Sequence, residues 1–254
     1  MTEQENQENQ ENQENQEYQF YCLSFNNPTR KENMKRIFKT LEIDCIFNEG
    51  VDENDIRITG RNIYTKCWSC MYGHLDMISD FYYNSDKQFG IFCEDDIFIH
   101  KDLKILIPKI IEDFNIMKLD VLLLGCLLPL KLDTRFNYEY SQFRIKHSSG
   151  NYKFHEYPDS MWGAQMYMLS RTHAKKLLDK YSFSSGYADK TNHSNDNTLQ
   201  PFSSDWTLTK DGNRALISPL LVSEDNKTNY EDKHQMVFHK KCFEAIFVPG
   251  LFIE

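Results

Sequence analysis

Three consecutive carboxylate residues, Glu94, Asp95 and Asp96, follow directly after the apolar run 89–93. This run predicts a buried strand, which would place the carboxylates at the sheet edge where open α/β sheets bind ligands. Carboxylate oxygens are the ligands that Mn²⁺ and Mg²⁺ prefer. Because two carboxylates separated by one residue can face the same ion, Glu94 and Asp96 are the predicted metal ligands. Asp95 then points elsewhere or contacts a nucleoside. The alternative for the whole triplet is a solvated acidic turn that caps the next helix.

Arg30 and the pair Cys67 and Cys70 also have side chains suited to chemistry. The planar guanidinium of Arg30 could pair with a phosphate or lie on a solvated helix face. The cysteines have the spacing of a redox site or of half a zinc site. Because no second cysteine pair or histidine pair completes a zinc set, the sequence favours two buried thiols.

The elements that must position these residues alternate between strands and helices, which is typical of an α/β fold. Short apolar runs predict strands at 20–25, 45–47, 89–93, 121–126, 162–170, 216–222 and 244–248. Helical spacing predicts helices at about 29–41, at 65–83, at 103–114, after Ser170 and at 203–206. Pro108 would interrupt or kink the helix at 103–114. Residues 129–156 predict a long loop or hairpin. The polar segment 182–201 predicts a flexible loop that could act as a lid.

The composition of the 254 residues fits one globular domain with an N-terminal tail. Residues 1–17 repeat Glu-Asn-Gln and predict a disordered tail, which leaves 18–254 as the domain. The whole chain has a formal net charge of −9, and the six glutamates of the tail account for −6, so the remaining residues hold only −3. This slightly acidic balance argues against nucleic acid as the main partner. No apolar run predicts a transmembrane segment. Seven cysteines, several in apolar runs, and the lack of a signal peptide pattern predict a cytoplasmic protein.

Four segments occur in a defined order. They are the strand, turn and arginine-bearing helix at 20–34, Ser-Cys-Met-Tyr-Gly-His at 69–74, the strand ending in Glu-Asp-Asp at 91–96, and Gly-x-x-x-Tyr-x-x-Ser-x-x-x-Ala-x-x-Leu at 163–177, with a later Asp-Trp at 205–206. Together they resemble glycosyltransferase family 25, the lipopolysaccharide and collagen galactosyltransferase-like enzymes, in which the matching segments have the same order. One segment differs from the family pattern at two positions: Ser69 stands where the family has Gly, and Gly73 where it has Ser. The resemblance covers residues 20–225.

The resemblance implies a GT-A-type, nucleotide-sugar-binding, Rossmann-like domain with a mixed central sheet. It also implies inverting transfer from a UDP-sugar, commonly UDP-galactose, to a hydroxyl of a glycan or protein. Mn²⁺ or Mg²⁺ on Glu94 and Asp96 would then hold the donor's diphosphate, with Arg30 and Asp95 also at the donor site. His74 would line that site, although a histidine on an apolar helical face is otherwise a hydrogen-bonded core residue.

Inverting transfer also needs a carboxylate that takes the proton of the acceptor hydroxyl. Asp205 is the first candidate for this base and Asp159 the second, whereas the alternative role of Asp205 is to complement a helix dipole. A transferase-like domain that only binds a glycan or assembles with other proteins is the competing hypothesis. A metal-dependent nucleotidyltransferase or phosphoesterase is a third, but the further carboxylates or histidines that a two-metal site needs are not evident.

Overall fold

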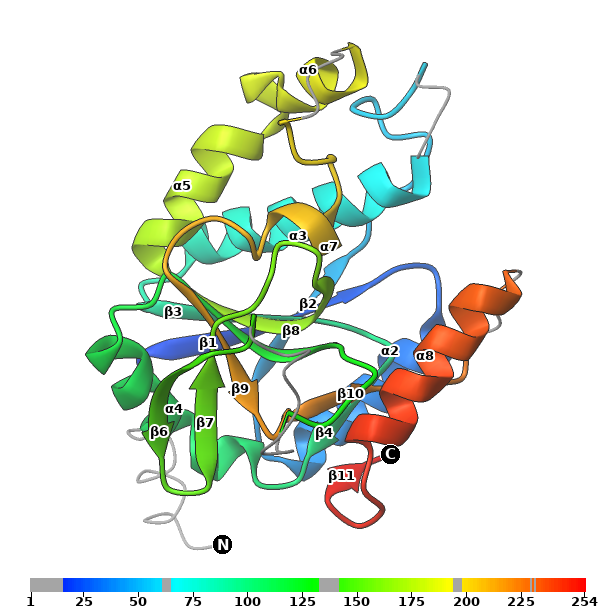
Figure 1. Cartoon of the computed structure of the whole chain (residues 1–254). Coiled ribbons are helices and arrows are strands. Elements are labelled where there is room, and N and C mark those ends of the chain that lie inside the picture. Colours follow the sequence, from blue (N-terminus) through cyan, green and yellow to red (C-terminus); the bar gives the residue numbers. More distant parts are fainter. Residues whose placement is uncertain (1–15, 61–64, 133–141, 194–197, 229, 231) are drawn as a thin grey trace, which may run out of the picture.

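A large mixed β-sheet with helices on both faces forms the centre of the computed structural model (Figure 1). The structure describes residues 16–60, 65–132, 142–193, 198–228, 230 and 232–254. Most of the predicted tail at 1–17 therefore lies outside the described residues. The eight strands of this sheet are β1 (Tyr18–Ser24), β2 (Cys45–Glu49), β3 (Phe89–Glu94), β5 (Val121–Leu127), β6 (Ile145–Ser149), β7 (Tyr152–His155), β8 (Trp162–Ser170) and β9 (Arg214–Ser218).

The strand order is β2-β1-β3-β8-β5-β9-β7-β6. β1 is parallel to β2 and β3, β5 is parallel to β9, and β8 runs antiparallel between β3 and β5. The carboxyl ends of β1, β2, β3, β5 and β9 therefore lie along the same edge of the sheet. This arrangement is consistent with a Rossmann-like fold, in which ligands bind outside that edge.

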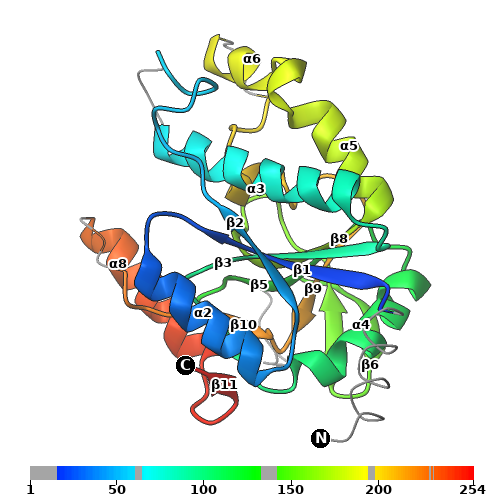
Figure 2. The ribbon, with the colours of Figure 1, turned by 180° about the vertical axis from the view of Figure 1, so that it is seen from behind.

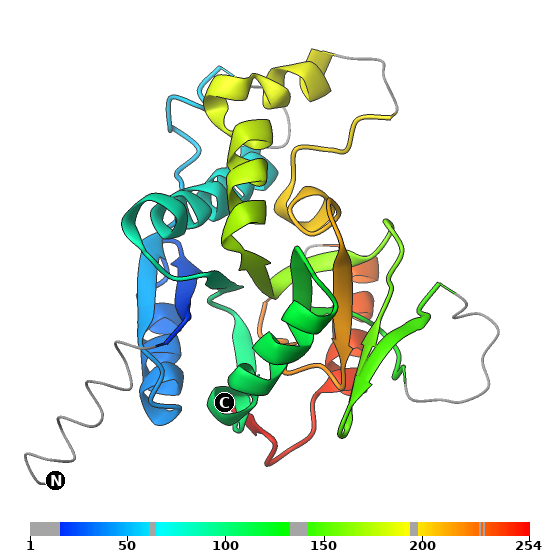
Figure 3. The same cartoon turned by 90° about the vertical axis from the view of Figure 1, so that its left-hand side faces the viewer.

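Helices cover the two faces of the sheet as separate layers. The helices are α2 (Pro28–Thr40), α3 (Thr65–Asn84), α4 (Leu103–Ile116), α5 (Arg171–Tyr181), α6 (Tyr187–His193), α7 (Ser204–Thr207) and α8 (Lys233–Ile246), with a 3₁₀ turn at Phe183–Ser185. In Figures 1 and 2, α3 and α5 lie on one face, and α2 and α4 on the other. Figure 3 shows the same two layers from the side.

Alternation along the strands supplies a core to each layer. In β1, Tyr21 and Leu23 belong to the cluster that packs against α3 and α5. Phe20 and Cys22 point the other way and join the cluster with α2 and α4. Because successive side chains of a strand point to opposite faces, a continuous apolar run is what a strand buried on both faces requires.

A smaller, three-stranded sheet was not predicted from the sequence. It consists of β10 (Val222–Glu224), β4 (Ile97–His100) and β11 (Phe252–Ile253), with β4 in the middle. β4 begins directly after the acidic triplet, and Asp225 N–H donates to the carbonyl of Asp96 at 2.8 Å. The chain therefore passes from the large sheet to the small one at the triplet, and both β3 and β4 fix its position.

Two strand predictions in the C-terminal part were wrong. Residues 244–248 are not a strand, because Ala245 and Ile246 continue the inner face of α8 that Cys242 begins, at helical spacing. The run 216–222 is divided between β9 and β10, which belong to different sheets. Pro219 lies between them and has no N–H for a ladder hydrogen bond, which suits the end of a strand.

Other irregular segments are partly regular. The predicted loop or hairpin at 129–156 contains the antiparallel pair β6 and β7. The predicted flexible loop at 182–201 contains a 3₁₀ turn and α6, with 194–197 outside the described residues. Pro108 does not interrupt α4, which continues through it to Ile116. Among the described residues, no helix is long and apolar enough to cross a bilayer.

Candidate functional site

A cavity of about 630 Å³ opens at the carboxyl ends of β1, β2 and β3. The first turns of α2 and α3 contribute Arg30 and Lys66 to its wall, so basic side chains and helix N-termini face the same space as the acidic triplet. A helix N-terminus and a basic side chain both favour bound anions. Its lining residues are Leu23, Phe25, Asn26, Arg30, Gly50, Val51, Asp52, Glu53, Lys66, Ser69, Cys70, Glu94, Asp95 and Asp96.

Local capping explains the position of Arg30. The side chain of Asn27 caps α2 by accepting a hydrogen bond from Arg30 N–H at 3.2 Å, and Pro28 occupies the first turn. The helix therefore starts immediately beyond β1. As a result, Arg30 projects from the first turn toward the end of the neighbouring β3.

Arg30 lies between two carboxylates of the triplet. Its Nη1 is 3.3 Å from Oδ2 of Asp96 and 3.6 Å from Oδ1 of Asp95. Its Nη2 donates to Thr228 Oγ1 at 2.6 Å, and Ser24 Oγ donates to Oδ2 of Asp95 at 2.7 Å. Arg30 is thus part of the carboxylate cluster, and the alternative of a solvated helix face does not hold.

The electrostatics of the triplet favour additional positive charge. Burial raises the pKa of Asp96 well above its usual value, and repulsion from Glu94 raises it further. The positive charge of Arg30 offsets only part of this effect. Burial is also the main reason why the pKa of Asp95 is raised. A cation bound at the cluster would favour the ionised form of both aspartates.

Glu94 points to a different set of partners. Its Oε1 lies 3.3 Å from Nε2 of His74 and 3.6 Å from Sγ of Cys70. Burial favours the neutral acid, but the hydrogen bond and charge of His74, with help from Cys70 and Arg30, hold the pKa of Glu94 below its usual value. Glu94 also lines the cavity. The structure therefore places Glu94 and Asp96 at one cavity but with different neighbours.

His74 lies behind Glu94 and does not line the cavity. It is fully buried in α3, and Nδ1 is 2.9 Å from the hydroxyl of Tyr167 on β8. With Glu94 ionised, Nε2–H donates to the carboxylate, and Nδ1 shares a hydrogen bond with the tyrosine hydroxyl. His74 is thus a hydrogen-bonded core residue that orients Glu94.

The Cys67 and Cys70 thiols are in different environments. Cys67 is exposed, so the prediction of two buried thiols was wrong for this residue, which lies on the outer side of α3. Cys70, His74 and Glu94 are the one group of three potential metal ligands within 4.8 Å of one another in the described part of the chain. Burial raises the pKa of the Cys70 thiol well above its usual value, and a neutral thiol is a poor metal ligand.

Asp205 approaches Glu94 from the side of β8 and α7. Its neighbour Ser204 places Oγ 3.3 Å from Sγ of Cys70, which itself contacts Glu94. Burial, and then repulsion from Glu94, raise the pKa of Asp205 to about 6. Asp205 does not line the cavity described above. The structure thus brings the two acidic residues together from distant parts of the sequence.

Asp159, the second candidate for the base, is placed differently. Its side chain is 65% exposed and forms an ion pair with Arg214. The carboxylate of Asp159 is therefore already paired with a guanidinium and lies in solvent. Asp205 therefore suits proton transfer better than Asp159.

The two differences from the family pattern in α3 both have structural consequences. A Cβ at Gly73 would lie 2.9 Å from Cδ1 of Leu23, so the glycine allows α3 to pack closely on β1. Ser69 lines the cavity, and its buried hydroxyl has no hydrogen-bond partner among the described residues. A buried hydroxyl without a partner is costly, so a polar ligand in the cavity would satisfy it.

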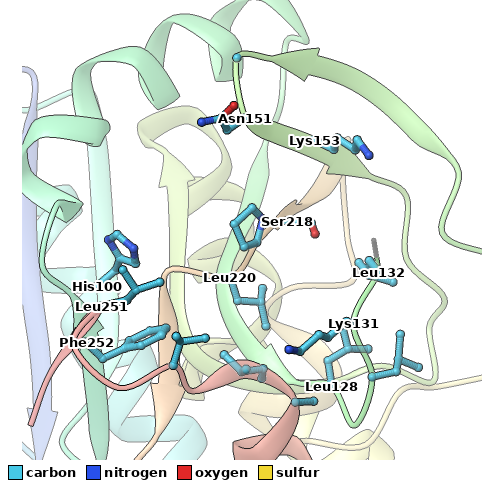
Figure 4. Close-up of a pocket in the computed structure, with 16 residues that line it drawn as sticks. His100, Leu128, Lys131, Leu132, Asn151, Lys153, Ser218, Leu220, Leu251 and Phe252 are labelled. Carbon is cyan, nitrogen blue, oxygen red and sulfur yellow. The ribbon is translucent and has the colours of Figure 1, made fainter. Parts of the chain in front are cut away.

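A second cavity, of about 390 Å³, has a different chemical character (Figure 4). Its wall is mostly aliphatic and includes Leu220 and Phe252, with the basic residues Lys131 and Lys153. Its described lining contains no carboxylate. The described lining of this cavity therefore lacks the carboxylate oxygens that would bind a divalent metal ion.

Several residues of the site were missed in the sequence. Ser24, Thr228 and Tyr167 complete the hydrogen bonding of Asp95, Arg30 and His74. Tyr167 belongs to a segment that resembles the family, but its spacing gave no sign of a contact with a histidine. Ser24 and Thr228 carry no local signal, because their roles arise only when distant segments pack together.

Comparison with known protein families found no match, and comparison with curated proteins found none either. The resemblance to glycosyltransferase family 25 therefore stays a hypothesis that rests on the residues quoted above.

Proposed function

We propose that the protein is an inverting glycosyltransferase of GT-A type, which transfers a hexose from a UDP-sugar to a hydroxyl of a glycan or protein. The observation that carries this proposal is the link between α7, which contains Asp205, and the acidic triplet: Ser204 contacts Cys70 at 3.3 Å, and Cys70 contacts Glu94 at 3.6 Å. One carboxylate cluster could hold a metal ion that binds the donor's diphosphate, while a separate carboxylate, with a pKa of about 6, accepts a proton.

The cavity suits the donor's nucleotide and phosphates. Phe25 and Val51 offer apolar surface for a nucleobase at the ends of β1 and β2. Lys66 and the N-termini of α2 and α3 supply positive potential for the diphosphate. Ser69 offers its unpartnered hydroxyl to a phosphate or sugar oxygen. A volume of about 630 Å³ lies in the range of small-molecule sites.

The acidic triplet fits Mn²⁺ or Mg²⁺. Its donor atoms are carboxylate oxygens, and the raised pKa of Asp96 reflects negative charge that Arg30 does not fully balance. Asp96 and Glu94 would hold the ion, with Asp95 beside them. When bound, the ion neutralises charge that develops on the departing diphosphate.

The chain's own residues supply the remaining chemistry. Asp205 accepts the proton of the acceptor hydroxyl while the acceptor oxygen forms a bond to the anomeric carbon of the sugar. The bond from that carbon to the diphosphate oxygen breaks, and its electron pair leaves with UDP. Arg30 pairs with the departing phosphate, and His74 keeps Glu94 ionised and oriented. The product carries the inverted anomeric configuration.

A scan of UDP-sugars for Mn²⁺-dependent hydrolysis or transfer tests the proposal. We expect turnover with at least one UDP-hexose, and we expect Asp96→Ala to abolish it. Asp86→Ala is the matched control, because the side chain of Asp86 is 92% exposed and lies outside the cavity lining. Absence of binding and turnover with every UDP-sugar, with and without metal, would exclude a transferase and favour a glycan-binding or assembly protein. Unchanged turnover in Asp96→Ala would refute the metal assignment alone.

A further inference from the structure

Trp162 and Trp206 form an aromatic pair next to Asp205. Their ring centroids are 5.1 Å apart with an interplanar angle of 64°, an edge-to-face contact. Trp162 is 43% exposed, while Trp206, which follows Asp205 in α7, is half-buried. The third tryptophan of the chain, Trp68, is by contrast buried at 4% exposure. An indole left in solvent at this position therefore needs an explanation.

The backbone of β8 holds Trp162 in this exposed position. Gly163 has a φ of +130°, and a Cβ there would lie 2.8 Å from Cα of Cys126 and 2.9 Å from the backbone N of Leu127. The register between β5 and β8 also shifts next to this glycine. The strand is thus built irregularly at its first residues, where an ordinary strand residue could not replace Gly163.

The tryptophan pair lies on the acceptor side of Asp205. The backbone of Ala164, two residues after Trp162, forms a hydrogen bond with the Asp205 carboxylate. Neither tryptophan lines the cavity of the triplet, which is built from β1, β2, β3, α2 and α3. The sequence neighbours of Asp205 thus reach two different surfaces: Ser204 contacts Cys70, which lines the cavity, and Trp206 belongs to the exposed aromatic pair. A base that takes a proton from the acceptor must face the molecule that carries that proton.

We propose that Trp162 and Trp206 form the acceptor subsite and that its ligand is a pyranose residue of a glycan. A pyranose ring has one face of C–H groups, which packs on the electron-rich face of an indole, while its hydroxyls remain available for hydrogen bonds. Stacking on Trp162 would bring a neighbouring hydroxyl toward Asp205. This inference rests on the proposed transferase function for its link to catalysis, but sugar binding can be measured separately.

Tryptophan fluorescence during titration with methyl β-D-galactopyranoside and methyl β-D-glucopyranoside is the direct test. We expect saturable quenching in the wild type, its loss in Trp162→Ala, and its retention in Trp162→Phe measured through Trp206. In transfer assays, Trp162→Ala should raise the acceptor KM about tenfold, equivalent to about 1.4 kcal/mol of lost binding, without raising the donor KM. Tyr83→Ala is the matched control, because it removes an aromatic side chain that is 71% exposed at the end of α3.

Each other outcome has a defined meaning. If Trp162→Ala shows the same quenching and the same acceptor KM as the wild type, the proposed subsite is overturned. Turnover of UDP-sugars with no quenching by either glycoside and an unchanged acceptor KM would overturn it as well. Quenching that depends on Trp162 in a protein with no UDP-sugar turnover would support a sugar subsite and refute the transferase function.

Discussion

The pH dependence of transfer gives the sharpest prediction about Asp205. Its carboxyl group must be ionised to accept a proton, and burial together with repulsion from Glu94 raises its pKa to about 6. The ionised fraction is then about nine tenths at pH 7 and about one tenth at pH 5. We expect kcat/KM for the acceptor to rise with pH through about 6 or somewhat below it, because a metal ion on Glu94 would offset part of the repulsion. Below this limb kcat/KM should fall about tenfold per pH unit.

Two variants test the cause of this acidic limb. Glu94→Gln removes the negative charge that raises the pKa of Asp205, so the limb should move to lower pH even though overall turnover decreases. Asp205→Asn removes the base, and turnover should fall by about 10² to 10⁴. The assay is initial-rate transfer at fixed Mn²⁺ between pH 5 and 8, with Asp86→Asn as the control. An acidic limb that stays in place in Glu94→Gln, or substantial transfer by Asp205→Asn, would refute this role for Asp205.

Further predictions concern stability and donor binding. Gly163→Ala should lower the free energy of unfolding by about 2 kcal/mol or more, because the added Cβ would press on backbone atoms at a φ of +130°. Urea denaturation measures this change, and an unchanged unfolding midpoint would contradict the prediction. Tyr167→Phe leaves Nδ1 of buried His74 without its partner and should lower the free energy of unfolding by about 1–3 kcal/mol in the same assay. Wild-type stability of this variant would show that the hydrogen bond contributes nothing. Arg30→Gln should weaken UDP binding at least about tenfold, since charged hydrogen bonds contribute about 1.5–3 kcal/mol, and wild-type affinity would exclude a phosphate contact.

The sequence predicts the buried strands and long helices well, because their patterns are local. The run 89–93 has apolar residues on both faces, and β3 is buried on both faces in the structure. The spacing that predicts a helix at 65–83 likewise corresponds to α3. The sequence does not indicate the small sheet, because β4 has only four residues. The apolar end of α8 gives the pattern of a strand, because a short apolar run does not distinguish a strand from a helix.

The candidate site was predictable in its members but not in its arrangement. The position of Glu94, Asp95 and Asp96 after an apolar strand indicated a ligand-binding edge. Which partner each carboxylate faces depends on packing between distant segments, and so Arg30 among the aspartates and His74 behind Glu94 could not be derived from spacing. The metal and donor assignments of these residues stay predictions.

Calorimetric titration of UDP in the presence of Mn²⁺ tests the central claim most directly. The donor is proposed to bind in the cavity of the acidic triplet through a metal held by Asp96, so we expect saturable binding that EDTA abolishes. Asp96→Ala should lose this binding, while Asp86→Ala should bind as the wild type does. UDP binding that is equally strong with EDTA or in Asp96→Ala would contradict the metal site, and no binding to the wild type would contradict the proposed function itself.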